Sequence, residues 1–549
     1  MGRTRRIRFN RVGGTNWADS ESGSGSDAGS DAGAPPAGAP SAGAAGRPRG
    51  GGGGGGGPVR YLCYFAQSLL DFRLAEVETL AAMAGAAHGA VTWEAPRNGD
   101  LSSPFWYATF PSRSVARHVA ERAVLLRALI EVWGEGADWA ALQSAVEAYP
   151  AARRSRHLGG GSSFRVKIDT WNFKWRDERK AGVLAALDFV GFQGRVDLSD
   201  SADASFWVIL AAPPPPGEGW DAYIIFGREV AIAASRALPT LFSLKSRRYL
   251  GPTSMDAEMA FVMANMAWVR PGQVVLDPFC GTGSILLAAA KRGAHVVGGD
   301  IDMRVLRLGK ANQKTGEAAD NFSNFRQYGL TWPAGLLRMD ASRPPFRPGL
   351  TEVFDAIVAD PPYGVRAGGR KSAPKEGAVV YDPATHFVST APYGLSECVD
   401  DLVALGARLL RPGGRLVFFI PVSPDTWDPS DLPDHPAMDL AGSCLQPLSQ
   451  RYGRRLLTYA KVGVFDAAAD AAWRAARSGF VMGIERVADA VWEPAEHRTK
   501  AQKRAARQRE REAAAAAAGG GGGGGGEAGA GSARERAARR DRGLVGAGV

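Results

Sequence analysis

The sequence of 549 residues carries a formal net charge of +10 and contains 70 glycines. This length exceeds one ordinary hydrophobic core, so we expect two or three domains beside segments that do not fold. The basic excess favours a polyanionic partner. The four cysteines lie far apart and form no C-x-x-C pair, which argues against a metal site and for reduced thiols in a cytosolic-type compartment. No apolar run approaches the length of a membrane span.

The composition changes near residue 58. Residues 1–57 are mostly Ser, Gly, Ala and Pro, which predicts a flexible tail. An organelle transit peptide at the arginine-rich start stays open, although few hydroxyl residues and the acids that follow disfavour one. The elements expected next are strands at residues 61–65 and 107–110 and amphipathic helices at residues 69–83 and 115–132. Glu76 and Glu78 fall on the polar side of the first helix, and the whole predicts a small α+β domain.

The block from residue 163 to residue 250 reads as a set of strands separated by turns. Phe164, Val166 and Ile168 alternate with polar residues, which is typical of a half-exposed strand. The stretches RVDLSD, SFWVILAA and AYIIFGREV predict further strands.

Basic and aromatic residues are interleaved in this block, which suits a stacked, phosphate-lined surface for RNA. The residues concerned are Arg165, Lys167, Lys174, Arg176, Arg179 and Lys180, with Trp171, Phe173 and Trp175 among them. An ordinary solvated face with tryptophans in the core fits the same pattern.

A helix with a methionine stripe follows. Thr253 and Asp256 resemble a helix cap before apolar residues at helical spacing, among them Met259 and Met263. That stripe predicts core packing.

The next segment predicts a strand, a glycine turn and a helix. Val274 to Leu276 leads into DPFCGTGS, which begins at Asp277 and includes Pro278 and Phe279. A glycine-rich turn serves dinucleotides, phosphates and S-adenosylmethionine alike. Gly281 and Gly283 match only the G-x-G part of the dinucleotide fingerprint, and no Walker lysine follows them. The carboxylate before the turn would repel a pyrophosphate, but it can pair with an ammonium group. Phosphate cofactors are therefore disfavoured.

Acids recur at the ends of the strands that follow. Residues 295–299 predict a strand that ends in Asp300, about 20 residues after the turn, where an acid accepts ribose hydroxyls in doubly wound folds. Asp340 lies near the end of another strand. Strand-end and helix-cap roles explain one such acid, but Asp300, Asp302 and Asp340 in succession favour a ligand site at the sheet edge.

A fourth strand, residues 354–359, runs into DPPYG. Pro361 and Pro362 hold a rigid turn with free carbonyl acceptors, and Asp360 adds a carboxylate beside them. Converging acceptors suit an exocyclic amine, whose lone pair they direct toward an electrophile, and Tyr363 can stack on the base. The pattern predicts amine methylation.

The remaining elements complete a sheet and then a tail. A basic loop from residue 368 to residue 378, flanked by Arg366 and including Arg370, is expected to be mobile over the base pocket. A helix at residues 402–410, a buried strand in RPGGRLVFFIPV and a closing strand follow. We place the domain boundaries at residues 1–57, 58–250, 251–466 and 467–549, with a weakly helical, then disordered tail last.

The motifs DPFCGTGS, GGDID and ADPPYGVR resemble those of the S-adenosylmethionine-dependent amino-methyltransferases. With RRYLGPTSMDAEMAFVMANMAWVRPG and DPPYGVRAGGRK, the sequence resembles the eukaryotic tRNA guanine-10 N2-methyltransferase catalytic subunit family from about residue 59 to residue 464. Residues 163–250 resemble the THUMP module of RNA-modifying enzymes. The resemblance implies a Rossmann-like α/β catalytic domain, preceded by a smaller α+β, THUMP-containing RNA-binding region.

The resemblance also implies a set of roles. The cofactor would be S-adenosylmethionine, and Thr253 and Ser254 would reach it. The partners would be tRNA and a small zinc-binding activator subunit, in the cytoplasm. The residues themselves, rather than the resemblance, predict an acceptor site at Asp360, Pro361, Pro362 and Tyr363 and RNA contacts at Lys174, Arg176, Arg179, Lys180, Arg366 and Arg370.

Other functions stay open. DPPY recognises an amine without telling which base carries it, so an amine of adenine or cytosine, or a guanine in another nucleic acid, fits as well. A catalytically silent RNA-binding scaffold is the alternative of another class, and the intact pair of motifs argues against it.

Overall fold

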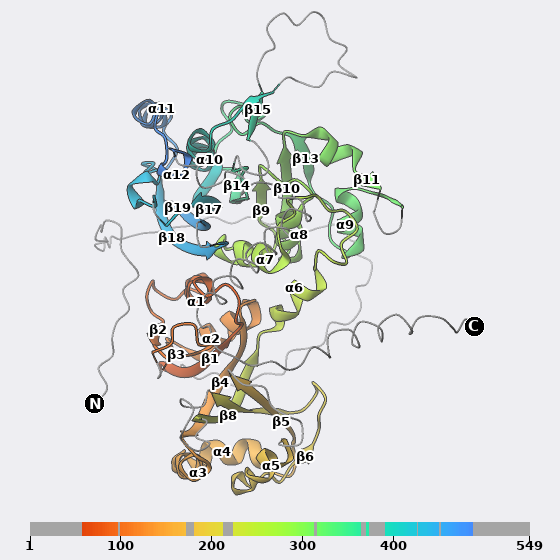
Figure 1. The fold of residues 1–549 in the computed structure, drawn as a ribbon, viewed down its shortest axis with the longest axis vertical. Coiled ribbons are helices and arrows are strands. Elements are labelled where there is room, and N and C mark those ends of the chain that lie inside the picture. The colour runs from red at the N-terminus through yellow and green to blue at the C-terminus, as the bar shows by residue number, and fades with distance from the viewer. Residues whose placement is uncertain are drawn as a thin grey trace, which may run out of the picture. The chain divides into compact units, whose positions relative to one another are not determined.

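The computed structural model describes residues 57–96, 99–171, 180–211, 223–311, 316–363, 369–372, 390–424, 426–449 and 452–486 (Figure 1). Within these residues the strands form two large sheets, one in the amino-terminal half and one in the carboxyl-terminal half. No described helix is both long enough and apolar enough to cross a bilayer.

The amino-terminal sheet has eight strands in the order β2-β3-β1-β4-β8-β7-β5-β6. Their bounds are β1 Val59–Phe65, β2 Thr92–Glu94, β3 Phe105–Phe110, β4 Leu126–Gly136, β5 Ser163–Trp171, β6 Arg195–Val196, β7 Ala204–Ala211 and β8 Tyr223–Ile232. The strands expected near the start of this region and in the block after residue 163 are confirmed. Both sets belong to one sheet, because β4 pairs with β1 on one side and with β8 on the other.

The helix expected over residues 115–132 is half wrong. Helix α2, Arg113–Arg122, begins at Ser112, whose hydroxyl accepts from Val115 N, and ends before the extended Ala123. The rest of the range is β4. The apolar residues of the run ALIEVW fit the spacing of a helix and that of a strand equally well, so the spacing alone could not distinguish the two structures. Pairing with distant strands makes this segment a strand.

Glu76 is not on a polar face. Helix α1, Phe72–Met83, buries this side chain completely. Its carboxylate accepts hydrogen bonds from Val124 N at 3.0 Å, Leu125 N at 2.9 Å and Asn265 Nδ2 at 2.7 Å. The buried acid thus satisfies backbone donors just before β4, which the helical period could not reveal.

The carboxyl-terminal sheet has seven strands in the order β13-β10-β9-β14-β17-β19-β18. Their bounds are β9 Val274–Asp277, β10 His295–Asp300, β13 Gly335–Arg338, β14 Phe354–Ala359, β17 Leu410–Val422, β18 Met438–Pro447 and β19 Gly453–Lys461. The first five run parallel and the last two close the sheet antiparallel. This is the doubly wound order, with the chain reversing its direction of winding between β9 and β14.

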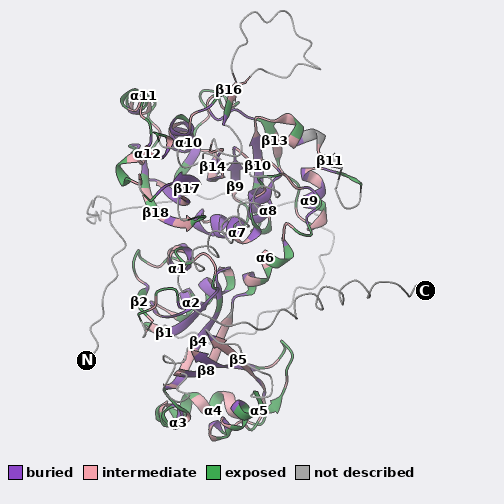
Figure 2. Cartoon of the chain, viewed as in Figure 1, coloured by how far each residue is buried: buried purple, intermediate pink, exposed green. Residues whose placement is uncertain are grey.

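Helices fill the connections of this sheet. They include α7 Ala257–Met266, α8 Ser284–Lys291, α9 Asn321–Gln327 and α10 Leu395–Leu409. Figure 2 shows β9, β14 and β17 as mostly buried, which agrees with the burial of Val275, Ile357 and Val417. A parallel strand covered on both faces reads as such a continuous apolar run.

The methionine stripe is core, as predicted. Met255, Met259, Met263 and Met266 are all buried in one cluster with α8 and the central strands. Asp256, rather than Thr253, caps α7, because its carboxylate accepts from Glu258 N at 2.9 Å while Thr253 is exposed in the preceding turn.

Two further helices lie within the range that the sequence assigned to a low-complexity tail. These are α11 Ala467–Ala476 and α12 Gly483–Arg486. Trp473, Met482 and Ile484 are buried, and Glu485 accepts from the backbone nitrogens at the start of α10. Residues 467–486 are therefore packed against the sheet's helices, although alanine dominates their composition.

Candidate active site

Three acids end neighbouring parallel strands. Asp277 is the last residue of β9, Asp300 the last of β10, and Asp360 follows β14 directly. Because β9 lies between the other two strands, the three side chains belong to one edge of the sheet. Asp277 lies close enough to both Asp300 and Asp360 for its charge to interact with theirs. The expected convergence at the carboxyl ends of the strands is therefore present.

The glycine turn between β9 and α8 is built as the sequence predicts. Gly281 and Gly283 have φ of +49° and +79°, the left-handed region that favours glycine. A side chain at Gly281 would meet open space, whereas one at Gly283 would lie 2.8 Å from Asn321 Oδ1. Gly281 N donates to Asp300 Oδ2 at 2.9 Å, so the turn is joined to the end of β10.

Asp277 and the two residues after it form the wall beneath this turn. Asp277 is 1% exposed and accepts from Phe279 N at 3.0 Å. Pro278 is buried and Phe279 half-buried.

Burial raises the pKa of Asp277 well above its usual range, and the charges of Asp300 and Asp360 add to the effect. The pKa of Asp300 is raised by burial as well. In the part of the chain that the structure describes, neither acid forms an ion pair with a Lys or Arg. The turn thus lies beside two acids and has open space at Gly281 without a paired cation, which fits a ligand that carries an ammonium group, a sulfonium and hydroxyl donors. S-adenosylmethionine has these groups.

The other residues assigned to the cofactor differ in their placement. Ser254 Oγ lies 2.7 Å from Thr282 Oγ1 inside the glycine turn, so this residue is at the site. Thr253 is exposed beside it. Asp340, two residues beyond β13, accepts from Ser342 N at 3.0 Å and from Ser372 N at 2.6 Å. Burial acts to raise the pKa of Asp340, but these hydrogen bonds outweigh it and lower the pKa.

The DPPY turn follows β14 directly. Pro361 is buried, and Asp360, Pro362 and Tyr363 are half-buried. The Tyr363 hydroxyl donates to Asp360 Oδ1. Burial raises the pKa of Asp360, while Arg454 acts to lower it. The Asp360 carboxylate is therefore half-buried beside one cation.

Arg454 is a site residue that the sequence did not reveal. It belongs to β19, and its Nη1 lies 3.5 Å from both Asp360 Oδ1 and the Tyr363 hydroxyl oxygen. No motif marks it, since only the antiparallel return of β19 beside β17 brings it to DPPY. Asn321, which lies against Gly283 and donates to Gly281 O at 3.2 Å, is a second such residue.

The basic residues proposed for RNA have mixed outcomes. Arg165 and Lys167 form ion pairs with Asp200 and Glu229 at 2.7 and 2.8 Å, and Trp171 is buried, so these three do not offer an RNA surface. Lys180 is exposed at the start of α5, Lys180–Ala185. Lys174, Arg176, Arg179 and Arg366 lie outside the described residues.

Residues 369–372 of the basic loop are described, and the rest of residues 368–378, where the expected mobility falls, lies outside the described residues. Strand β15, Arg370–Ser372, pairs antiparallel with β16, Thr390–Pro392. Arg370 donates to the carbonyl oxygen of Thr390 at 3.1 Å, and Lys371 forms an ion pair with Glu397. The far partner strand is 20 residues away in sequence, so local composition did not show the pairing.

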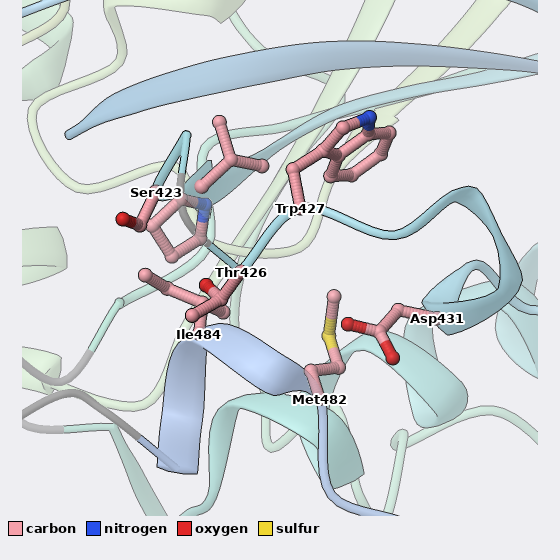
Figure 3. A pocket seen from close by; sticks show the side chains of 8 residues that line it. Ser423, Thr426, Trp427, Asp431, Met482 and Ile484 are labelled. Carbon is pink, nitrogen blue, oxygen red and sulfur yellow. The ribbon is translucent and has the colours of Figure 1, made fainter.

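One pocket among the described residues lies apart from this site. It is lined by the end of β17, the segment after it and residues around α12: Pro421, Val422, Ser423, Thr426, Trp427, Asp431, Met482 and Ile484 (Figure 3). Its volume of about 10 Å³ is close to the minimum for a single water molecule. No residue expected to act on a cofactor or a base lines it.

Two family models match the chain. Residues 59–231 match the Tmrp11 THUMP N-terminal domain, and residues 245–376 match the RMKL-like methyltransferase domain. Together with the doubly wound sheet and its acidic edge, these matches define a Rossmann-like, S-adenosylmethionine-dependent methyltransferase with a THUMP-containing amino-terminal region.

The particular family follows from the curated relatives. The mouse tRNA (guanine(10)-N(2))-methyltransferase TRMT11 is 37% identical over 74% of this chain and 89% of its own length. The human TRMT11 is 36% identical over the same shares. The chain belongs to the TRMT11 family. Among solved structures, TrmN from Thermus thermophilus is 21% identical over 73% of this chain and 99% of that chain, with a TM-score of 0.37, which supports no inference by itself.

Proposed function

We propose that this protein transfers a methyl group from S-adenosylmethionine to the exocyclic N2 amine of guanine 10 in tRNA. The observation that carries the proposal is the position of Asp360, a half-buried acceptor on the strand next to Asp277 and the glycine turn. The chain's TRMT11 relatives, whose names state this reaction, support the choice of substrate.

The residues of the turn would hold the cofactor. We assign Asp277 to its amino group and Asp300 to its ribose hydroxyls, since each carboxylate offers an acceptor at the sheet edge. Gly281 leaves room for close approach of the ligand. The full set proposed for the cofactor is Thr253, Ser254, Asp277, Pro278, Phe279, Gly281, Gly283, Asp300 and Asp340.

The DPPY turn would hold the amine. The sulfonium of the bound cofactor supplies an electrophilic methyl group, so the chain's task is to align the attacking nitrogen with it. Asp360 and the carbonyl of Pro361 would accept the two amine hydrogens and aim the lone pair. Asp360 is an orienting acceptor rather than a full base, because the aryl amine loses its proton readily only once it is methylated. Tyr363 would contact the base, which must be exposed or flipped to reach it.

Substrate choice would depend on the amino-terminal region, residues 58–250. A turn that orients any aromatic amine cannot select one guanine, so contacts elsewhere must set which nucleotide arrives. We assign Lys180 and Arg370, with the undescribed Lys174, Arg176, Arg179 and Arg366, to phosphate contacts. Recognition of this kind depends on shape and on salt.

We also propose a small zinc-binding activator subunit as partner. Strand β13 is an edge of the catalytic sheet, and an unpaired edge can accept a strand from another chain. Leu337 on this strand is 36% exposed and Trp332 just before it is 57% exposed. Covering this surface would improve solubility. Co-expression should therefore raise the soluble yield, and a soluble, fully active isolated chain would contradict the proposal.

The proposed location is the cytoplasm. All four cysteines are buried free thiols, as a reducing compartment allows. Fractionation of cells that express a tagged chain tests this directly.

The experiment that tests the proposed reaction uses labelled S-adenosylmethionine and total RNA. The protein, alone and with the activator, is incubated with both, and the labelled nucleoside is identified after digestion. We expect N2-methylguanosine from tRNA. Label in an adenine or cytosine nucleoside, or in another RNA, would replace this proposal with one of the alternatives left by the sequence.

A further inference from the structure

A single arginine on β19 contacts both polar groups of the DPPY turn. Nη1 of Arg454 lies 3.5 Å from Asp360 Oδ1 and 3.5 Å from the Tyr363 hydroxyl oxygen. The Tyr363 hydroxyl in turn donates to the same Asp360 oxygen. The three side chains thus contact one another, and the Arg454 guanidinium donates both to the Asp360 carboxylate and to the Tyr363 hydroxyl. None of the three side chains belongs to the glycine turn.

The arginine is itself held from three sides. Its Nε donates to Gln446 Oε1 at 2.7 Å, across the β18–β19 pair in which these two residues stand opposite. Its guanidinium carbon lies 4.0 Å from the centre of the Phe419 ring on β17. Its Nη2 lies 3.7 Å from Met255 Sδ, just before α7. Such contacts fix a long side chain that would otherwise sample many rotamers.

One oxygen of the Asp360 carboxylate remains available to accept a hydrogen bond from the substrate. Oδ1 of Asp360 receives both Tyr363 and Arg454, and among the described residues no group donates to Oδ2. The side chains of Arg454 and Asp360 are only 15% and 23% exposed, so solvent screens their attraction weakly. A cation beside a half-buried carboxylate favours its ionised form.

We propose that Arg454 is a positioning residue of the acceptor site: it pairs with Oδ1 of Asp360 and holds this carboxylate together with Tyr363, so that Oδ2 faces the incoming amine. The inference rests on the proposed function, because it adds the β18–β19 hairpin to the site that orients the amine. Gln446 acts through Arg454 by fixing the guanidinium plane.

The effect on pH dependence follows from the groups that face Asp360. These are Arg454 from β19, Tyr363 from the turn and Asp277 from β9. Burial raises the pKa of Asp360, and Arg454 opposes this rise. Without Arg454 the pKa of Asp360 therefore lies still higher. The ionised carboxylate accepts the amine hydrogen more strongly than the protonated acid does, so the acid limb of the methylation rate should move to higher pH.

The test compares Arg454→Met and Arg454→Lys with Arg455→Met in the full chain, with the activator where it is required. Arg455 is the matched control: it is the next residue on β19, faces the other side of the sheet, and lies over Trp427 with Nη1 3.1 Å from Ser443 Oγ. Single-turnover methylation of tRNA is measured across pH. The Asp360 carboxyl is titrated by carbon-13 NMR, with Asp360→Asn assigning the signal.

For Arg454→Met we expect a rate loss of about tenfold or more at the acid end, a smaller loss at the alkaline end, and a higher pH for the Asp360 titration. Arg454→Lys should restore part of the rate, since it keeps the charge but not the planar fork. Arg455→Met should match the wild type. A loss by the same factor at every pH, or an unchanged Asp360 titration, would overturn the inference. If the wild type transfers no methyl group, the proposed function fails, and the NMR titration still decides the role of Arg454.

Discussion

At the residue scale, the site divides into two groups of acids with separable tasks. Asp360 is assigned to the amine, so Asp360→Ala should lower the single-turnover rate by about 10²–10³-fold, with cofactor affinity nearly unchanged. Asp300→Ala should do the reverse and weaken cofactor binding first, because Asp300 meets the glycine turn and not DPPY. Calorimetric cofactor titration beside rapid-quench methylation separates the two. A normal methylation rate for Asp360→Ala would contradict the assignment of Asp360 to the amine.

The buried charge of Asp277 gives a second prediction. Its pKa in the folded state lies above the unfolded value, so the folded protein binds this proton more tightly than the unfolded protein does. The raised pKa therefore costs stability at pH values above the unfolded pKa, and this cost decreases as the pH falls below the folded pKa and is gone below the unfolded pKa. Asp277→Asn should raise the melting temperature of the cofactor-free protein at pH 7, and the difference from the wild type should shrink at lower pH.

The same substitution should weaken cofactor binding, because the amide carries no charge to pair with an ammonium group. Asn still accepts from Phe279 N, so the turn is kept. A lower melting temperature for Asp277→Asn at pH 7 would show that the carboxylate stabilises the empty fold, contrary to this account.

The sequence located most site residues at this scale because their signals are local. A strand, two glycines at positive φ and an acid lie within about ten residues, and DPPY is contiguous, so both follow from nearest-neighbour chemistry. Arg454 has no such signal. Arg454 lies beside Asp360 because β19 pairs antiparallel with β17, and the register of such a pair depends on residues far apart in the sequence. The ion pairs of Arg165 and Lys167 could not be predicted for a related reason, since their acidic partners come from other strands or loops.

At the scale of elements, the start of β4 depends on one buried acid. Glu76→Ala would leave Val124 N and Leu125 N without their acceptor, at a cost of about 3 kcal/mol in the free energy of unfolding. Glu147→Ala, on the exposed face of α3, Trp139–Ala148, is the control and should change it by less than about 0.5 kcal/mol. Urea unfolding measures both. Equal stabilities for the two variants would show that the backbone donors find other partners.

Helices α11 and α12 give the prediction for the end of the catalytic domain. A chain that stops after residue 464 loses the buried Trp473, Met482 and Ile484, together with the Glu485 carboxylate at the start of α10. It should be destabilised by several kcal/mol, at about 2–3 kcal/mol for each large apolar group, relative to a chain that stops after residue 491. Thermal unfolding of both chains decides this. Matching melting temperatures would mean that residues 467–486 contribute no packing.

The predictions for residues 467–486 and for residues 115–132 differ from the structure for two different reasons. The alanine-rich composition of residues 467–486 is typical of a low-complexity segment, although three large apolar side chains are enough to pack it against the domain. In residues 115–132 the apolar spacing fits helix and strand alike, and the pairing of β4 with β1 and β8 decides. Strands β9, β10 and β14 were predicted nearly to the residue, because a buried parallel strand bounded by turn residues has a distinctive pattern.

At the scale of the whole molecule, the account divides recognition of tRNA from chemistry on the base. Replacement of Lys174, Arg176, Arg179 and Lys180 by Gln should weaken tRNA binding and reduce its dependence on salt, because fewer phosphates are neutralised. Cofactor affinity should not change. Lys291→Gln, an exposed change at the end of α8, is the control. Binding measured at several salt concentrations tests this, and an unchanged salt slope would move the RNA surface elsewhere.

The central claim is methyl transfer to the N2 amine of guanine 10 through Asp360. The most direct measurement is the methylation of a single tRNA by the wild type and by Asp360→Asn, with the modified nucleoside identified and its position mapped by mass spectrometry of the digested RNA. We predict N2-methylguanosine at position 10 with the wild type and its near absence with the variant. Methylation at another position, or the same yield from both proteins, would contradict the account.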